Sequence, residues 1–164
     1  MKKFAILLLA LCLLTAGACA EAAKEINWSD VEGSIAEAGW GGGFMELEDL
    51  GLKVYIPDAL KQVESEDYYA AFTTDEQDFT FVILVEELGY TSLSDFADAI
   101  KDNVEELDYE TVNGLTGLSY KSEDAGYMSF ITDKGYTISF VFTPIADEDY
   151  LAVAAVIVAS IQAL

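Results

Sequence analysis

The closing segment of the chain constrains its fold more than any other stretch. Residues 147–164 read DEDYLAVAAVIVASIQAL, the pattern of a helix that is apolar on almost every side after an acidic first turn. Acidic residues suit that turn because the helix dipole places positive charge there. The apolar run is about 14 residues long, whereas a membrane-spanning helix needs about 20. Because such a helix has no polar face for solvent, the sequence predicts a core helix covered by other parts of the chain.

Most of the remaining chain alternates polar and apolar residues, which is the pattern of β-strands. In residues 79–85 both alternating faces are apolar, which predicts a central strand that is covered on both sides. Turn signals lie between the expected strands. Hairpins are predicted at residues 44–58, 67–87 and 126–144, and a strand pair or one bent strand is predicted at residues 109–122.

Two further helices are predicted. Residues 28–38 have apolar residues at helical spacing, and Ser29 and Glu32 have the spacing of a capping box. Residues 92–103 form the other helix, with Ser92 as its N-cap and one apolar face that is expected to be buried.

A glycine-rich stretch, GWGGG at residues 39–43, follows the first helix and precedes a strand. A phosphate-binding loop has the opposite order and carries a lysine with a serine or threonine, which this stretch lacks. We therefore interpret Gly39 as the end of the helix and Gly41 to Gly43 as a hinge-like connector. Trp40 is expected to anchor this connector on the body of the protein.

The first 20 residues have the layout of a secretory signal peptide, with two lysines, a short apolar stretch and then small residues. Ala18-Cys19-Ala20 fits a cleavage site that would leave a mature chain beginning at Glu21. The alternative is a bacterial lipobox in which Cys19 carries a lipid. The expected localisation is therefore secreted or extracytoplasmic, with lipid anchoring as the alternative, and no transmembrane segment is expected in the mature chain.

The mature chain would be strongly acidic. Its six lysines face 30 acids, which gives a net charge of −24, and the sequence contains no arginine and no histidine. Such a surface repels nucleic acid and anionic lipid, so neither is expected as a partner. Two interpretations of the charge remain: a surface that keeps a secreted protein soluble, or one that binds cations or a basic partner.

The residue inventory limits the available chemistry. Without histidine, arginine or a cysteine after residue 20, the mature chain has no catalytic triad, thiol nucleophile, thiolate or imidazole metal site, or bidentate phosphate clamp. Paired carboxylates could hydrolyse a glycosidic bond, and Glu86-Glu87 and Glu105-Glu106 are candidate pairs. A chain with 30 acids also produces such pairs by chance, so no catalytic or cofactor-binding residue is assigned.

Two loops offer the oxygen ligands that calcium prefers: Asp75, Glu76 and Asp78 in one, and Asp147 and Asp149 in the other. Neither has the spacing of a calcium-binding loop, and the second is also explained by helix capping. No metal site is therefore assigned.

Several tyrosines lie near expected strand or helix ends, where a ring can face water. A tyrosine cluster can bind sugars or a protein partner, although tyrosine is also a favoured strand residue. The candidates are Tyr68, Tyr69, Tyr90, Tyr109, Tyr127 and Tyr150.

The order of elements and four short motifs resemble the PsbP-like superfamily, the α/β/α sandwich of the photosystem II extrinsic protein and its bacterial relatives. The motifs are Ile56-Pro57 at a strand end, Ser92-Leu93 at a helix start, Asn113-Gly114-Leu115 at a strand start and Ser160-Ile161 at a helix end. The resemblance would cover residues 43–164. It implies an antiparallel β-sheet with helices packed on both faces, an extracytoplasmic setting and no shared catalytic residues.

We therefore expect one α+β domain at residues 43–164, preceded by a signal peptide (1–20) and by an added N-terminal helix with a connector (21–42). The expected function is that of a non-enzymatic binding or interaction module at the cell exterior, without a cofactor. Its partner would be a protein, a glycan or a cation. The alternatives are a small carboxylate-dependent hydrolase and a lipid-anchored envelope lipoprotein with Cys19 as the modified residue.

Overall fold

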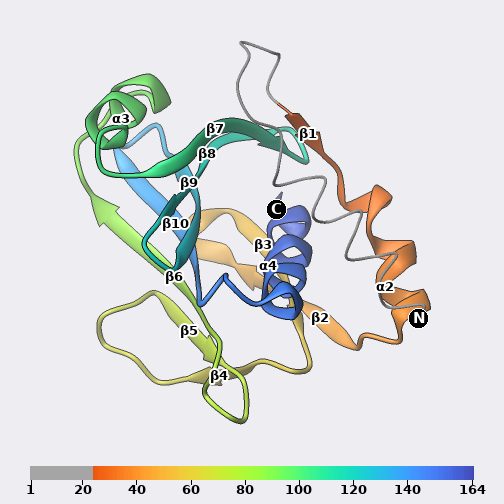
Figure 1. Ribbon diagram of the computed structural model, residues 1–164. Coiled ribbons are helices and arrows are strands. Elements are labelled where there is room, and N and C mark those ends of the chain that lie inside the picture. Colours follow the sequence, from red (N-terminus) through yellow and green to blue (C-terminus); the bar gives the residue numbers. More distant parts are fainter. Residues whose placement is uncertain (1–23) are drawn as a thin grey trace.

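The computed structural model describes residues 24–164, which form two β-sheets with helices between and beside them (Figure 1). The expected α+β class is confirmed. The signal peptide predicted at residues 1–20, with Cys19 and either processing site, lies outside the described residues. Among the residues that are described, no helix is long and apolar enough to cross a membrane.

The larger sheet has eight strands within the described part of the chain. They are β1 (Lys24–Ile26), β4 (Lys61–Val63), β5 (Ala70–Thr73), β6 (Thr80–Glu87), β7 (Glu105–Val112), β8 (Leu115–Ser122), β9 (Ala125–Ile131) and β10 (Tyr136–Thr143). Their order is β1-β7-β8-β9-β10-β6-β5-β4, and all neighbours are antiparallel except β1, which runs parallel to β7. Strand β6 lies inside the sheet with Phe81 and Val82 buried on opposite faces, as its two apolar faces predicted.

A second, smaller sheet corrects the expectation of a single sheet. It consists of β2 (Gly42–Leu47), β3 (Leu52–Pro57) and β11 (Gln162–Ala163), in the order β11-β3-β2. A 3-10 turn, η2 (Glu48–Leu50), joins β2 to β3 at the predicted hairpin turn. The edge of β3 that could have paired with the larger sheet is occupied by the end of the chain. There β11 pairs with β3, and the Tyr55 N–H donates to Ser160 Oγ at 2.8 Å.

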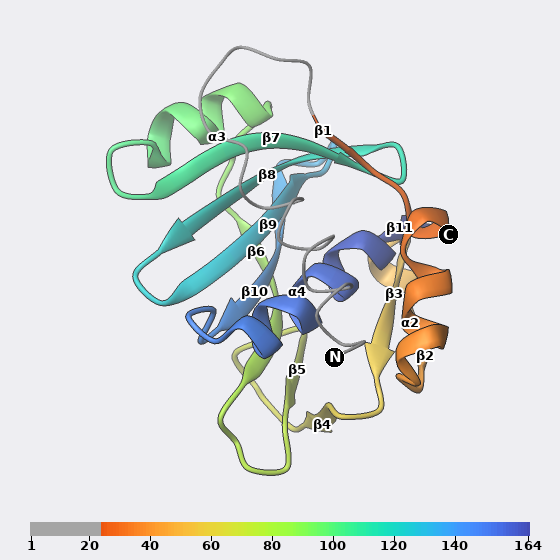
Figure 2. The same cartoon turned by 45° about the vertical axis from the view of Figure 1, so that its right-hand side comes forward.

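Helix α4 (Glu148–Ser160) lies between the two sheets (Figure 2). Every residue from Ala154 to Ser160 is buried, as the all-round apolar pattern predicted. One core cluster joins this helix to the phenylalanines of the larger sheet and to Leu52 and Val54 of the smaller one. The helix is apolar on two sides because a sheet covers it on each. Asp147 is its N-cap and accepts from the backbone N–H of Asp149 at 2.8 Å.

Helix α3 (Leu93–Ile100) packs on the other face of the larger sheet. One strand can contribute to both clusters because successive side chains point to opposite faces. On β9, Met128 and Phe130 belong to the core around α4, and Ile131 belongs to the cluster under α3. Ser92 caps α3 as predicted, accepting from the Asp95 N–H at 3.1 Å. Helix α3 packs over β8 and β9. Within the described residues, the rest of that face carries no helix (Figure 1).

Residues 28–38 differ from the single capped helix that was predicted. They form a 3-10 turn, η1 (Trp28–Asp30), and then α2 (Glu32–Ala38). The predicted capping box is wrong: Val31 occupies the N-cap of α2, and no side chain caps either element. Gly39 ends α2 with a φ of 73°, as expected. Trp40 packs against the cluster that holds α2 on the smaller sheet, which agrees with its expected anchoring role.

Of the three glycines expected to form a connector, Gly42 and Gly43 belong to a sheet and only Gly41 lies outside β2. Gly42 and Gly43 begin β2, where they pair with Pro57 and Ile56. A Cβ atom on Gly42 would lie 2.5 Å from the Ile56 carbonyl oxygen and 2.5 Å from the Tyr55 hydroxyl, whereas a Cβ atom on Gly43 would meet nothing within 4 Å. The run therefore contains one position that requires glycine because two backbones approach closely.

Asn113 links three parts of the fold. With Gly114 it forms the two-residue turn between β7 and β8, at φ values of 47° and 84°, which suit a type I′ hairpin. Its side-chain amide donates to the carbonyl oxygens of Ala159 and Ile161, each at 2.8 Å, at the end of α4. Its Oδ1 accepts from the Trp28 N–H at 2.7 Å. One side chain thus satisfies the end of the core helix and fixes the N-terminal segment.

Gly42→Ala is expected to destabilise the protein by about 1–3 kcal/mol, because the new methyl group must displace the β3 backbone or the Tyr55 ring. Gly43→Ala, one residue further along the same strand, is expected to change the free energy of unfolding by less than about 0.5 kcal/mol. Urea denaturation of both variants measures the difference. Equal stabilities would show that β3 yields freely to a side chain at position 42.

Asn113→Gly keeps the turn conformation and removes only the three side-chain hydrogen bonds. We expect a loss of about 2–4 kcal/mol, since each such bond contributes about 0.5–1.5 kcal/mol. The shift of the urea midpoint at constant slope measures the loss. Asn103→Ala, at an exposed position after α3, is the matched control and should leave the midpoint unchanged. A midpoint shift no larger than that of the control would mean that water replaces Asn113 without cost.

Candidate functional site

A row of side chains crosses the face of the larger sheet on which α3 packs, from the edge strand β4 to the side of α3. It follows directly paired positions on six neighbouring strands, and paired residues point to the same face. The members, from β4 to β8, are Val63, Ala71, Val82, Val141, Tyr127 and Tyr120. We call this set the tyrosine–valine row. Six strands at a spacing of about 4.8 Å make it about 24 Å long.

The row passes from an exposed edge to a firmly held aromatic end. Val63 is 41% exposed on the short edge strand β4, Ala71 and Val82 are buried in the sheet surface, and the other three members are half-buried. The rings of Tyr120 and Tyr127 stack with their centroids 4.7 Å apart and their planes within 6°. Phe96 of α3 meets Tyr120 edge-on at 6.2 Å.

Hydroxyl groups fix the position of Tyr120. Its phenol shares a hydrogen bond of 3.2 Å with Ser129 Oγ, which shares one of 2.8 Å with Ser139 Oγ. Both serines are buried in the centre of the sheet. Burial raises the pKa of Tyr120, and Tyr127 and Glu86 act in the same direction, whereas the hydrogen bonds with the serines lower it. Tyr120 is therefore held as a neutral ring in one orientation.

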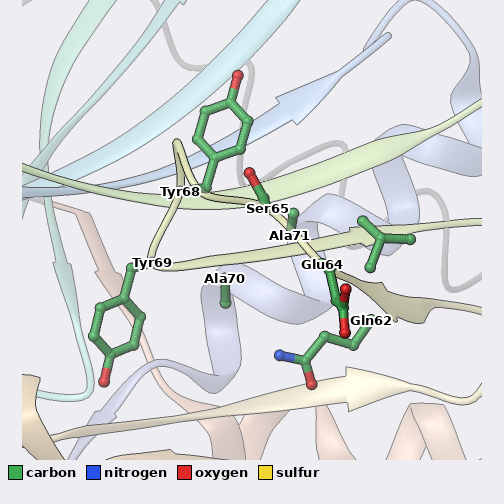
Figure 3. Close-up of a pocket in the computed structure, with 8 residues that line it drawn as sticks. Gln62, Glu64, Ser65, Tyr68, Tyr69, Ala70 and Ala71 are labelled. Atoms are coloured by element: carbon green, nitrogen blue, oxygen red, sulfur yellow. The ribbon is translucent and has the colours of Figure 1, made fainter.

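Tyr68 joins the row from the loop between β4 and β5. Figure 3 shows Tyr68 and Tyr69 pointing to opposite sides of this loop. Tyr68 is 42% exposed, and with Glu123 it reinforces the effect of burial in raising the pKa of Tyr127. Tyr69 instead has its pKa raised by burial and then by Asp49 and Glu48, on the side of the smaller sheet.

A hollow of about 390 Å³ lies beneath this loop, next to the exposed end of the row (Figure 3). Val63 and Ala71 of the row are part of its wall, so the hollow and the row are continuous. Its lining residues are Gln62, Val63, Glu64, Ser65, Tyr68, Tyr69, Ala70 and Ala71.

The other tyrosines singled out in the sequence do not join this site. Tyr90 packs on Phe96 at 5.2 Å, and Tyr150 stacks on Phe79 at 5.0 Å. Tyr109 is exposed on β7, beyond the end of the row. Of the six candidates, Tyr68 and Tyr127 lie at the row and Tyr69 lines the adjoining hollow.

Tyr120 was missed by sequence reasoning, although a local signal for it exists. Glu123 and Asp124 form a two-residue turn between β8 and β9, with Ser122 paired to Ala125. Counting outward from that turn places Tyr120 opposite Tyr127. The three aliphatic members on β4, β5 and β6 pair with one another in neighbouring hairpins, but their alignment with the tyrosines depends on the pairing of β6 with β10, which are distant in the sequence.

The loops that offered calcium ligands use their carboxylates for other contacts. Asp75 forms an ion pair with Lys61. Asp78 accepts from Thr74 Oγ1 at 2.5 Å and from the Tyr150 hydroxyl, and this hydrogen bond raises the pKa of Tyr150 to about 12. Asp147 caps α4. Across residues 24–164, no group of three or more potential metal-ligating side chains is present.

Each of the two candidate carboxylate pairs has a feature that does not suit glycoside hydrolysis. Glu86 and Glu87 are consecutive in β6, so they point to opposite faces and cannot face each other across a cleft. Glu106 lies at a bulge with a φ of 51° and forms an ion pair of 2.6 Å with Lys121. The first pair therefore lacks the facing carboxyls that glycoside hydrolysis uses, and in the second pair one carboxylate is engaged by a lysine.

One carboxyl group, Glu110 on β7, is buried with only 4% of its surface exposed. Burial raises its pKa, while the positive charge of Lys24 and a hydrogen bond from Ser119 lower it to a smaller extent. Its Oε2 atom has no hydrogen-bond partner among the described residues. Glu110 lies on the face of β7 that turns away from the tyrosine–valine row, so it is not part of this site.

The chain is similar to a solved structure. No protein-family model and no curated protein matches the chain. The solution structure of cyanobacterial PsbP (CyanoP) from Synechocystis sp. PCC 6803 matches with a TM-score of 0.49 and 11% sequence identity, over 92% of this chain and 99% of that chain. At this identity the likeness concerns only the path of the chain.

Glu110→Gln is expected to raise the melting temperature at about pH 7 and to have little effect at about pH 3. A carboxyl group whose pKa is raised by folding stabilises the protein fully at low pH, and this contribution is lost as the pH rises above its unfolded-state pKa. Calorimetry at both pH values tests this. Glu25→Gln, an exposed change of the same charge on β1, is the control. A lower melting temperature for Glu110→Gln at neutral pH would mean that the attraction to Lys24 outweighs burial.

Proposed function

We propose that this chain is an exported, non-enzymatic binding protein and that the tyrosine–valine row is its binding surface. The observation that carries the proposal is the row itself. It is a continuous line of directly paired side chains that ends in two stacked tyrosines and borders a hollow. Tyrosines held in place give a partner a large contact area at a low cost in side-chain entropy.

Several features support rigidity at this surface. Phe96 contacts Tyr120 from one side and Tyr127 stacks on it from the other, and the buried serines hold its hydroxyl. By contrast, Tyr68 and Val63 at the other end are exposed on a loop and on a three-residue edge strand. A fixed platform next to an adaptable loop is an arrangement suited to binding.

The non-enzymatic part of the proposal rests on the chemistry of the row. Its polar groups are phenols and serines that bond to one another, and the chain has no histidine to act as a base for them. The carboxylate hydrolase remains the competing function, and the buried Glu110 is the group that favours it. Export rests on the layout of residues 1–20, with lipid attachment at Cys19 as the alternative.

Screening the mature protein against a random peptide display library and a glycan array tests the proposal. Ligands found in this way should lose at least about tenfold in affinity with Tyr127→Ser or Tyr68→Ser, because central aromatic residues dominate binding energy. Tyr136→Ser is the matched control: Tyr136 is 38% exposed and lies at the start of β10, outside the row. Ligands that tolerate both row variants would place the binding surface elsewhere, and a failure to find any ligand would remove the function.

A further inference from the structure

The charged groups beside the tyrosine–valine row are carboxylates. Glu86 lies close enough to Tyr120, and Glu123 close enough to Tyr127, to reinforce the effect of burial on each phenol. The loop that carries Tyr68 adds Glu64, which lines the hollow, and two further acids in its ESED sequence. Negative charge therefore borders the row along its aromatic end and along the hollow.

Positive charge near this surface is largely paired. Lys61, on the edge strand β4, forms an ion pair with Asp75. Lys121 pairs with Glu106 and Lys101 pairs with Asp98. The row therefore combines apolar side chains and aromatic faces with an excess of carboxylates.

This combination matches cationic side chains. The face of a tyrosine ring attracts an ammonium or guanidinium group, and a neighbouring carboxylate adds an ion pair. In the middle of the row the half-buried Val141, next to the buried Val82, has no charge to offer and suits an apolar contact. A length of about 24 Å exceeds a single amine and equals about seven residues of extended chain at about 3.3 Å per residue.

We propose that the partner of this surface is a basic segment of a protein, in which lysine or arginine side chains alternate with apolar ones. One cationic group lies over Tyr127 and Tyr68 and pairs with Glu123, another pairs with Glu86 beside Tyr120, and the apolar side chains contact Val141 and Val63. This inference rests on the proposed function of the row and adds the chemistry of its partner. A neutral glycan can also stack on tyrosine, but it gains nothing from the carboxylates.

Three synthetic peptides of about seven residues test the inference, since that length matches the row. One alternates lysine with valine, and the others replace each lysine with glutamine or with glutamate. A neutral cello-oligosaccharide represents the glycan alternative. We expect the lysine peptide to bind roughly tenfold or more tightly than the glutamine peptide, and to weaken as salt is added. The glutamate peptide and the oligosaccharide should not bind.

Two charge variants separate a local effect from the overall acidity of the chain. Glu86→Gln with Glu123→Gln should weaken the lysine peptide by roughly five- to tenfold, from two partly exposed ion pairs. Glu37→Gln with Glu46→Gln makes the same change in net charge on α2 and β2, beyond the smaller sheet, and should change binding less than about twofold. Circular dichroism confirms that each variant is folded.

The outcomes distinguish the two levels of the proposal. The lysine and glutamine peptides could bind equally, or only the oligosaccharide could bind. If Tyr127→Ser abolishes that binding, the binding function of the row stands and the basic partner is overturned. Equal weakening of lysine-peptide binding by both double variants would mean that only the overall charge of the protein matters. That result would also overturn the basic partner. If no probe depends on Tyr127 or Tyr68, neither the basic partner nor the binding role of the row stands.

Discussion

The fold depends on covering a helix that has no polar side. Helix α4 lies between two sheets, and every residue from Ala154 to Ser160 is buried. Burial alone would leave the last carbonyl groups of the helix without partners. Ser160 accepts from the Tyr55 backbone and donates to the Ile157 carbonyl oxygen, and Asn113 donates to those of Ala159 and Ile161. Through these contacts the end of the helix holds the smaller sheet and the β7–β8 turn in place.

The same arrangement determines which face of the larger sheet is available to the proposed partner. One face of the larger sheet is used for the core around α4, so any exposed binding surface on that sheet has to lie on its other face. Helix α3 covers part of that face, where its Phe96 and Ala97 pack on β8 and β9. The remaining part carries the tyrosine–valine row. Buried serines beneath Tyr120 hold this end of the row by hydrogen bonds, in addition to the contact of Tyr120 with Phe96 of α3.

Local patterns in the sequence were enough to predict the hairpins, the Ser92 cap and the buried closing helix, because each depends on residues close together in the chain. Long-range pairing was not predictable in this way. Nothing near Tyr55 indicates that its edge of β3 is closed by the end of the chain, and so the second sheet was missed. Two of the tyrosine candidates, Tyr68 and Tyr127, lie at the row, but the row itself depends on register across six strands. Asn113 was noted only as part of a motif, and its role appears only when α4 lies beside it.

The turn at Asn113 has a chemical consequence for the lifetime of the protein. An asparagine followed by glycine is the pairing in which the side-chain amide cyclises most readily onto the next backbone nitrogen, and asparagine is among the thermolabile residues. Here the amide is engaged with two carbonyl oxygens, which restrains it while the protein is folded. Conversion to aspartate would replace that donor with a carboxylate facing both oxygens. Spontaneous deamidation of Asn113 would then release the end of the core helix.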